Sequence, residues 1–428
     1  MASGYNNVPM PERHGKPSSP VRLDAWGKPL PRLKLVVIIS DGVPENAGQS
    51  LGVASWLARR TNADVMELAI PELNPTARRK LTLSATKLLQ GNRRKARDWL
   101  AQAGALNITR QLGQWVTIRN IKEGDAASLV IISAGSVPAF YNVALGYIWR
   151  CTCATIMTPS VLGAEPFDFA IIPAHDFPLE LSNIMTTTGA PNTIVRDELA
   201  PAAELLLKKF PPLYPRRWGM IIGGGHDGYT ISAEWVHRTL GKIFREAAGA
   251  NIDLYITTSR GTPTEAEAAI QRLASNSSNV RFLLLASDDE TNHVPAMLGA
   301  CDEIFVTDDS VYPASEAVTA GHRVILMRTE RTGWTKHVSQ SATSVMVAVG
   351  LLPKRALWGP PRYDRTFAEF EEMGALAEFK DWTREYRLRV GDENVPPEED
   401  EGYNQYEDFN EARRAADWII EKLGVDTK

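Results

Sequence analysis

Short continuous apolar runs recur along this chain, and each ends in a loop of polar residues or glycine. Segments with helical spacing separate the runs, such as QSLGVASWLARR after the first of them. A short apolar run is typical of a strand buried on both faces, and its alternation with helices indicates a parallel sheet. The first series consists of LKLVVIIS, SLVIISAG, CATIMT and FDFAIIPAHD, at residues 33–40, 128–135, 153–158 and 167–176.

The pattern then begins again after a proline-rich stretch, KKFPPLYPRR at residues 208–217. The second series consists of RRWGMIIGGG, NIDLYITTSRG, NVRFLLLAS, DEIFVTDDS and HRVILM, at residues 216–225, 251–261, 279–287, 302–310 and 322–327. Two complete series predict an α/β fold of two tandem doubly wound, Rossmann-like domains whose strand ends face a common cleft.

The predicted domain boundaries lie where the composition changes. The parts are a flexible proline-rich arm at 1–32, an N-terminal α/β domain at 33–207, a linker at 208–217, a C-terminal α/β domain at 218–350 and a helical extension at 351–428. No strand is expected after about residue 350, because helical spacing replaces the apolar runs there. Residues 391–410 carry eight acids and no Lys or Arg, which predicts an exposed acidic loop.

The composition predicts a cytoplasmic protein that does not bind nucleic acid. The net charge of −4 gives no general attraction to nucleic acid or to anionic membranes. No apolar stretch reaches the ~18 residues that a membrane span needs, and the polar, proline-rich start is expected to be neither a signal peptide nor a transit peptide. Three cysteines do not make a disulfide framework, which favours a reducing compartment.

The loops after the strands contain the candidate site residues, because ligands of open parallel sheets bind outside the carboxyl ends of the strands. In the first series these residues are Asp41, Gly42, Ser133, Gly135 and His175. In the second series they are Gly224, Gly225, His226, Ser259, Arg260, Thr262, Asp309 and Ser310. Two such edges facing each other make a natural substrate site.

Several of these residues suit a nucleotide diphosphate. The glycines at 223–225 let backbone N–H groups approach an anion, although a strand-to-helix turn that needs positive φ is the alternative. Arg260 precedes a helix and could clamp a phosphate, or it could form a salt bridge at the helix start. Glu316 lies six residues after Ser310, where a carboxylate could accept hydrogen bonds from two ribose hydroxyls. Its alternative is a solvated helix acid.

No metal and no resident cofactor are predicted. Asp308 and Asp309 are adjacent, and adjacent carboxylates cap a helix more often than they chelate, while the histidines show no ligand spacing. A second charged feature is the stretch 78–97, in which eight cations stand beside Leu and Trp. It could face an anionic acceptor or a membrane surface, or it could be the solvated side of helices.

The strand-end loops together resemble the elongated-mitochondria fission-factor family, whose bacterial relatives look like GT-B glycosyltransferases. The matching motifs include ISDGVPENAGQSLGVA, IIGGGHDGY, ITTSRGTP and DEIFVTDDSVYPASEAVTAG, at 39–54, 221–229, 256–263 and 302–321. Shorter motifs at 129–135, 167–176 and 186–192 keep the same order, and the resemblance covers roughly residues 33–330.

The resemblance implies a GT-B-like pair of domains, with the donor nucleotide on the C-terminal domain and the acceptor on the N-terminal domain. It also implies that the end of the chain packs back on the N-terminal domain. Asp41 would act as the general base with His175 in reserve, and Gln49 keeps its place on the acceptor side. Four positions depart from the usual pattern. Glu45 stands where the family usually has glycine, Gly225-His226 replaces Pro-Asn, and Gly261 replaces a second arginine.

Three functions are compatible with this reading. The first is a metal-independent transferase that uses a nucleotide-activated sugar or a related donor as substrate. The second is a non-catalytic adaptor that recruits a dynamin-like partner at the mitochondrial outer surface, as the family name implies. The third is a sugar-nucleotide epimerase on the same fold, and the fold alone does not choose among them.

Overall fold

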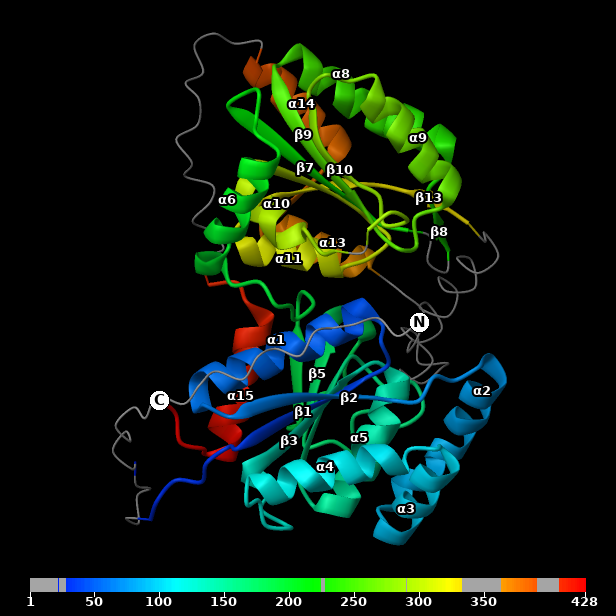
Figure 1. Ribbon diagram of the computed structural model, residues 1–428, viewed down its shortest axis with the longest axis vertical. Helices are drawn as coiled ribbons and strands as arrows, with labels where there is room; N and C mark the ends of the chain where they lie inside the picture. The colour runs from blue at the N-terminus through cyan, green and yellow to red at the C-terminus, as the bar shows by residue number, and fades with distance from the viewer. Residues whose placement is uncertain (1–21, 23–27, 225–227, 290, 333–362, 391–407) are drawn as a thin grey trace.

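The computed structural model describes residues 22, 28–224, 228–289, 291–332, 363–390 and 408–428, without the side chains of residues 385 and 387–390. Two parallel six-stranded sheets with flanking helices, one above the other in Figure 1, form two doubly wound domains. This is the predicted GT-B-like fold class. No helix among the described residues is both long and apolar enough to cross a membrane.

The first sheet has the strand order β2-β1-β3-β4-β5-β6. Its strands are β1 (Leu35–Ser40), β2 (Asp64–Ala69), β3 (Leu129–Ala134), β4 (Thr152–Ile156), β5 (Phe169–Pro173) and β6 (Ile184–Thr187). The helical segments of this part are α1 (Pro44–Thr61), α2 (Pro75–Ser84), η1 (Ala85–Gln90), α3 (Arg93–Gln102), α4 (Leu106–Ile118), η2 (Ala126–Ser128), α5 (Ser136–Trp149) and η3 (Ala174–Asp176).

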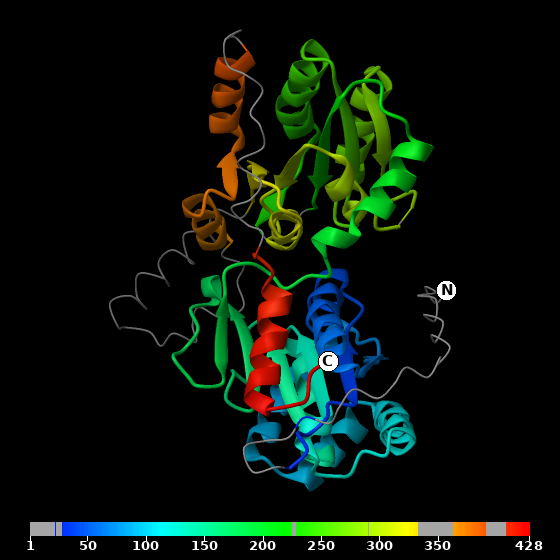
Figure 2. The same cartoon turned by 90° about the vertical axis from the view of Figure 1, so that its left-hand side faces the viewer.

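Alternate residues of β1 serve the two faces of the first sheet. Val36 and Ile38 pack under α1 and α15 (Glu411–Leu423), whereas Leu35 and Val37 pack under α3, α4 and α5. Both faces are therefore buried, which explains why the strand is apolar at every position before Ser40. Figure 2 shows α15, in red, beside α1, in blue.

The second sheet has the strand order β10-β9-β7-β11-β12-β14. Its strands are β7 (Arg216–Ile222), β9 (Ile252–Thr258), β10 (Val280–Leu284), β11 (Glu303–Thr307), β12 (Val324–Met327) and β14 (Leu376–Glu378). A small antiparallel pair joins β8 (Tyr229–Thr230) to β13 (Glu330–Arg331).

Helices again cover both faces of the second sheet. Those of one face are α6 (Ala200–Lys209), which follows η4 (Arg196–Glu198), α10 (Val294–Ala300), α11 (Tyr312–Ala320) and α13 (Asp364–Glu372). Those of the other face are α7 (Ala233–Trp235), η5 (Val236–Leu240), α8 (Gly241–Gly249), α9 (Thr264–Ser275) and α14 (Phe379–Val390).

The structure differs from the predicted domain parts at two elements. Helix α6 precedes the predicted linker but packs against α10, because its apolar face is part of the core of the second sheet. Strand β14 lies in the predicted helical extension, where it pairs with β12 and completes the second sheet. The chain after residue 362 therefore contributes to both domains. Strand β14 belongs to the second sheet, and α15 packs on the first sheet.

The two domains are connected twice, by segments that lie side by side. The backbone N–H of Thr188 donates to Glu411 Oε1 at 2.8 Å, and Asn410 Nδ2 donates to the carbonyl of Ile194 at 3.3 Å. The predicted linker is fixed to the second domain instead, since the N–H groups of Leu213 and Tyr214 both donate to Asp253 Oδ2. We therefore place the hinge between the domains at 188–194 and 408–411.

Candidate donor and acceptor site

Each sheet has one point at which its strand order reverses. In the first sheet this point lies between β1 and β3, and in the second between β7 and β11. Doubly wound sheets bind ligands outside the carboxyl ends of the strands at this switch point. The predicted site residues Asp41 and Gly135 follow the first pair of strands, and Gly224 and Asp309 follow the second pair.

At the switch point of the second sheet, the glycine turn holds an internal carboxylate. Oδ2 of Asp309 accepts from the backbone N–H of Gly224 at 2.8 Å, and the hydroxyl of Thr307 accepts from the N–H of Gly223 at 2.7 Å. A Cβ atom on Gly223 would overlap the Asp309 carboxylate, so this position requires glycine. The turn thus donates to an anion, and that anion is a side chain of the protein itself.

The neighbouring loop after β9 is tied to the glycine turn. Thr262 donates its hydroxyl to the carbonyl of Gly223 at 2.6 Å and accepts from the N–H of Ser259 at 3.1 Å. A Cβ atom on Gly224 would overlap the backbone of Gly261, so the two glycines allow the two loops to touch. Arg260 is exposed in the middle of this loop. The structure therefore brings Ser259, Arg260 and Thr262 to the switch point.

At the switch point of the first sheet, Asp41 organises the start of α1. Its carboxylate accepts from the N–H of Val43 at 3.2 Å and from Asn46 Nδ2 at 3.3 Å. Gly135 has a φ of 84° and lies against the Asn46 amide, which would be 3.0 Å from an added Cβ atom. Gly42 also has a positive φ, of 75°, which permits the tight turn after β1.

Two predicted acceptor-side residues lie inside the first domain instead of at its surface. Ser133 is fully buried, and its hydroxyl accepts from Asn142 Nδ2 at 2.9 Å. Gln49 is 6% exposed, and its Nε2 lies 3.9 Å from the sulfur of Met157. In this arrangement both side chains hold strands and helices together and face no open space.

The two switch points meet across the domain boundary. Oε1 of Glu45, in the first turn of α1, accepts from the hydroxyl of Ser310 at 2.9 Å. The phenol of Tyr312 lies directly against Gly48, where an added Cβ atom would overlap it. Helix α1 of the first domain therefore touches the start of α11 of the second domain.

Glu316 is buried at this contact. Glu316 is only 3% exposed, so it is not a solvated acid on the helix surface. Burial raises the pKa of its carboxyl to about 8, and the charge of Glu45 adds to the rise, while a hydrogen bond with Tyr312 opposes it. The carboxyl is therefore mainly protonated at neutral pH.

His175 lies at a second contact between the domains. Its Nδ1 is 2.7 Å from the hydroxyl of Thr366 on α13, and its ring meets Tyr363 edge to face at 5.9 Å. Burial lowers the pKa of His175, although the nearby charge of Asp176 opposes this shift. The imidazole is therefore neutral at neutral pH and is held between η3 and α13.

Residues 46–423 match the family described as mitochondrial fission ELM1. The chain belongs to this family. The predicted family membership is therefore confirmed, and the match extends beyond the resemblance at 33–330 to α15. No curated protein matches the chain.

Solved structures of GT-B enzymes are similar to this family member over most of its length. The UDP-GlcNAc 2-epimerase from Neisseria meningitidis, bound to UDP-GlcNAc, is 12% identical with a TM-score of 0.44, covering 91% of this chain and 98% of its own. A UDP-glucosyltransferase from Polygonum tinctorium is 10% identical with a TM-score of 0.43, covering 92% and 99%.

Asp308, next to Asp309, belongs to a network of hydrogen bonds and ion pairs in the second domain. Its carboxylate accepts from the N–H of Thr329 at 2.8 Å and contacts Arg328 and Arg331 at 3.4 and 3.2 Å. Within the described part of the chain, no three His, Cys, Asp or Glu side chains are grouped as a metal site would need. The adjacent aspartates thus have separate roles, one in this network and one in the glycine turn.

Two predicted site residues, Gly225 and His226, lie outside the described residues. Other residues of the site were missed by the sequence analysis. Thr366 and Tyr312 were missed because their partners are distant in sequence, 191 residues away in the case of Thr366 and His175. Glu45 was missed for the same reason, since its partner Ser310 is 265 residues away.

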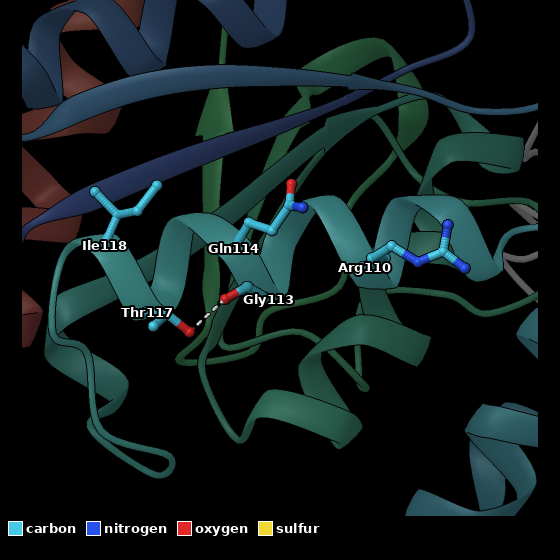
Figure 3. Close-up of a pocket in the computed structure, with 5 residues that line it drawn as sticks. All are labelled: Arg110, Gly113, Gln114, Thr117 and Ile118. Carbon is cyan, nitrogen blue, oxygen red and sulfur yellow. Dashed lines mark hydrogen bonds between the residues drawn. The ribbon is translucent and has the colours of Figure 1, made fainter.

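A hollow lies on α4 (Figure 3). It has a volume of about 610 Å³ and is lined by Arg110, Gly113, Gln114, Thr117 and Ile118. The hydroxyl of Thr117 donates to the carbonyl of Gly113 within the same helix at 2.9 Å. Because all five residues come from one helix face, we assign the hollow no part in the site.

Proposed function

We propose that this chain is a GT-B-like transferase that binds a nucleotide-activated sugar or a related donor between its domains. One observation carries the proposal: the switch points of two doubly wound sheets meet across the Glu45–Ser310 hydrogen bond. Each switch point is the expected ligand site of its own sheet. A ligand that spans both would have its donor part on the second domain and its acceptor on the first.

The proposed roles follow from the chemistry at each sheet. A leaving nucleotide diphosphate needs charge stabilisation, which Arg260 and the backbone N–H groups of the glycine turn and of Ser310 can supply. Glu316 would accept the ribose hydroxyls once α1 and α11 separate. Asp41 would remove the proton of the acceptor, because its carboxylate stands at the open end of β1. No metal is part of this proposal.

The adaptor function has an observation in its favour. The carboxylate of Asp309 already uses the N–H of Gly224, and Glu45 already accepts from the hydroxyl of Ser310. A donor phosphate would have to displace both carboxylates and overcome their charge. A protein that kept the fold and recruited a dynamin-like partner at the mitochondrial surface would not need this displacement. An epimerase would share the donor site with the transferase.

A thermal-shift screen of the full chain with nucleoside diphosphates and nucleotide sugars tests the proposal. A ligand that binds the native state alone raises the melting temperature in proportion to the logarithm of its concentration. We expect one nucleotide class to do so. The Arg260→Ala variant should bind it about tenfold or more weakly, because a charge-assisted hydrogen bond is lost.

Arg272→Ala is the matched control, since Arg272 is an exposed arginine on α9, away from the strand ends. It should bind as the wild type does. No shift with any nucleotide would contradict the transferase and the epimerase alike, and would leave the adaptor as the better account. An equal loss in both arginine variants would show that the nucleotide binds elsewhere.

A further inference from the structure

The segment from α2 to α3 carries a concentrated positive charge that the proposed function does not use. Residues 75–102 contain eight Lys and Arg side chains and one acid, the exposed Asp98 on α3, although the whole chain has a net charge of −4. The eight are Arg78, Arg79, Lys80, Lys87, Arg93, Arg94, Lys95 and Arg97. All of them are exposed except Arg93, which is half-buried.

These cations are almost entirely without acidic partners. Arg93 pairs with Glu123 at 2.6 Å, and Lys95 contacts the neutral amide of Gln90. None of the other six forms an ion pair with any residue that the structure describes. A solvated helix face normally carries charges of both signs, which offset one another. Here eight cations stand against one exposed acid of the same helices, Asp98, so a solvated face of mixed charge does not account for the excess.

The same segment exposes large apolar side chains. Leu83 on α2 is 69% exposed, and Leu89 on η1 is 49% exposed. Their neighbours Leu81 and Leu88 are buried in the core of the first domain, so the segment is firmly attached. Trp99 strengthens the attachment, because its Nε1 donates to the hydroxyl of Ser84 at 2.9 Å and joins α3 to α2.

We propose that the α2–α3 surface docks this chain on an anionic lipid bilayer. Each cation near an anionic bilayer adds to the attraction, and apolar side chains that enter the interface add to it further. Exposed leucines among cations favour a bilayer over nucleic acid, whose backbone would attract the cations but offers the leucines no apolar partner. Figure 1 shows α2 and α3 on the outside of the first domain, clear of the second domain. The proposal does not depend on the transferase.

Vesicle co-sedimentation with the full chain tests this proposal. We expect binding to vesicles of phosphatidylcholine mixed with phosphatidylglycerol, weak binding to phosphatidylcholine alone, and weakening with salt. The triple variant Arg78→Ser/Arg79→Ser/Lys80→Ser should lower the partition coefficient on the order of a hundredfold, at roughly fivefold per cation. The double variant Leu83→Ser/Leu89→Ser should lower it several-fold without changing the dependence on salt.

The matched control is Lys208→Ser/Lys209→Ser/Lys422→Ser, which removes three exposed cations at the ends of α6 and α15. It should bind vesicles nearly as the wild type does, and melting curves should confirm that all variants fold. Equal losses in both triple variants would overturn the proposal, because net charge alone would then explain the binding. Absence of vesicle binding by the wild type, or tighter binding to a nucleic-acid duplex than to vesicles, would overturn it as well.

Discussion

At the scale of single residues, the protonation of Glu316 gives the most direct test of the contact between α1 and α11. Its pKa of about 8 in the folded state lies above the ordinary value of 4.5. The folded state therefore holds this proton more tightly than the unfolded state does. The resulting stability is fully present below about pH 4.5 and is lost as the pH rises through about 8.

We expect the free energy of unfolding of the wild type to fall by roughly 3 kcal/mol between about pH 6 and about pH 9. Glu316→Gln should remove most of this fall, because the amide keeps the shape of the carboxyl but does not ionise. Chemical denaturation at both pH values measures the difference. Parallel pH profiles for the wild type and the variant would mean that the carboxyl is not held protonated at this contact.

The glycine turn makes a second prediction at this scale. Gly224→Ala should lower the free energy of unfolding by about 2 kcal/mol or more, because the new methyl group meets the backbone of Gly261. Gly249→Ala is the control, since an added Cβ atom there meets nothing within 4 Å. It should change stability by less than about 1 kcal/mol. Equal effects would show that the two loops do not touch.

The candidate site was only partly predictable from its residues. The loops after β7, β9 and β11 could be located because a strand-end loop is a local feature of the sequence. The internal partners could not, since Glu45 and Ser310 are 265 residues apart and only the packing of two domains joins them. The buried positions of Ser133 and Gln49 have the same explanation, because their surroundings come from other segments.

At the scale of elements, α15 holds the first domain together from the far end of the chain. Ile419 is fully buried under α1, and Trp418 meets Phe169 edge to face at 5.0 Å. We expect Ile419→Ala to lower the free energy of unfolding by about 2–4 kcal/mol, through lost apolar burial and a cavity. Glu421→Ala, on the exposed side of α15, should change it by less than about 0.5 kcal/mol. If chemical denaturation shows an equally small change in the free energy of unfolding for both variants, α15 does not pack tightly on the first domain.

The elements that the sequence failed to assign correctly depend on tertiary contacts. Strand β14 has only three residues and lies between helical segments, so its apolar pattern is too short to distinguish it. Helix α6 has an ordinary amphipathic pattern, and nothing local says which sheet its apolar face will cover. The long apolar runs of β1, β3, β7 and β9, in contrast, were recognisable because burial on both faces leaves few polar positions within them.

At the scale of the whole molecule, the hinge segments 188–194 and 408–411 set how closely the domains approach. A Cβ atom on Gly189 would lie 2.9 Å from both Ser315 Oγ and Phe370 Cζ, and 3.1 Å from Phe409 Cζ. Gly189→Val should therefore push the domains apart and raise the radius of gyration measured by small-angle scattering. Gly249→Ala again serves as the control. An unchanged scattering curve would place the hinge elsewhere.

The central claim is that the two switch points form a donor site and that Glu45 closes it in the absence of a ligand. Calorimetry with the nucleotide that gives the largest thermal shift tests this claim directly, using wild type, Glu45→Gln and Glu45→Gly. Glutamine removes the charge and retains a side chain that can accept from Ser310, whereas glycine removes both.

We predict that affinity rises in the order wild type, Glu45→Gln, Glu45→Gly, with about tenfold or more between the first and the last. Such a gain corresponds to the ~1.4 kcal/mol or more that displacing the carboxylate would otherwise cost the ligand. Affinities that are equal in all three proteins, or lower in Glu45→Gly than in wild type, would contradict the claim that the donor binds at the Glu45–Ser310 contact.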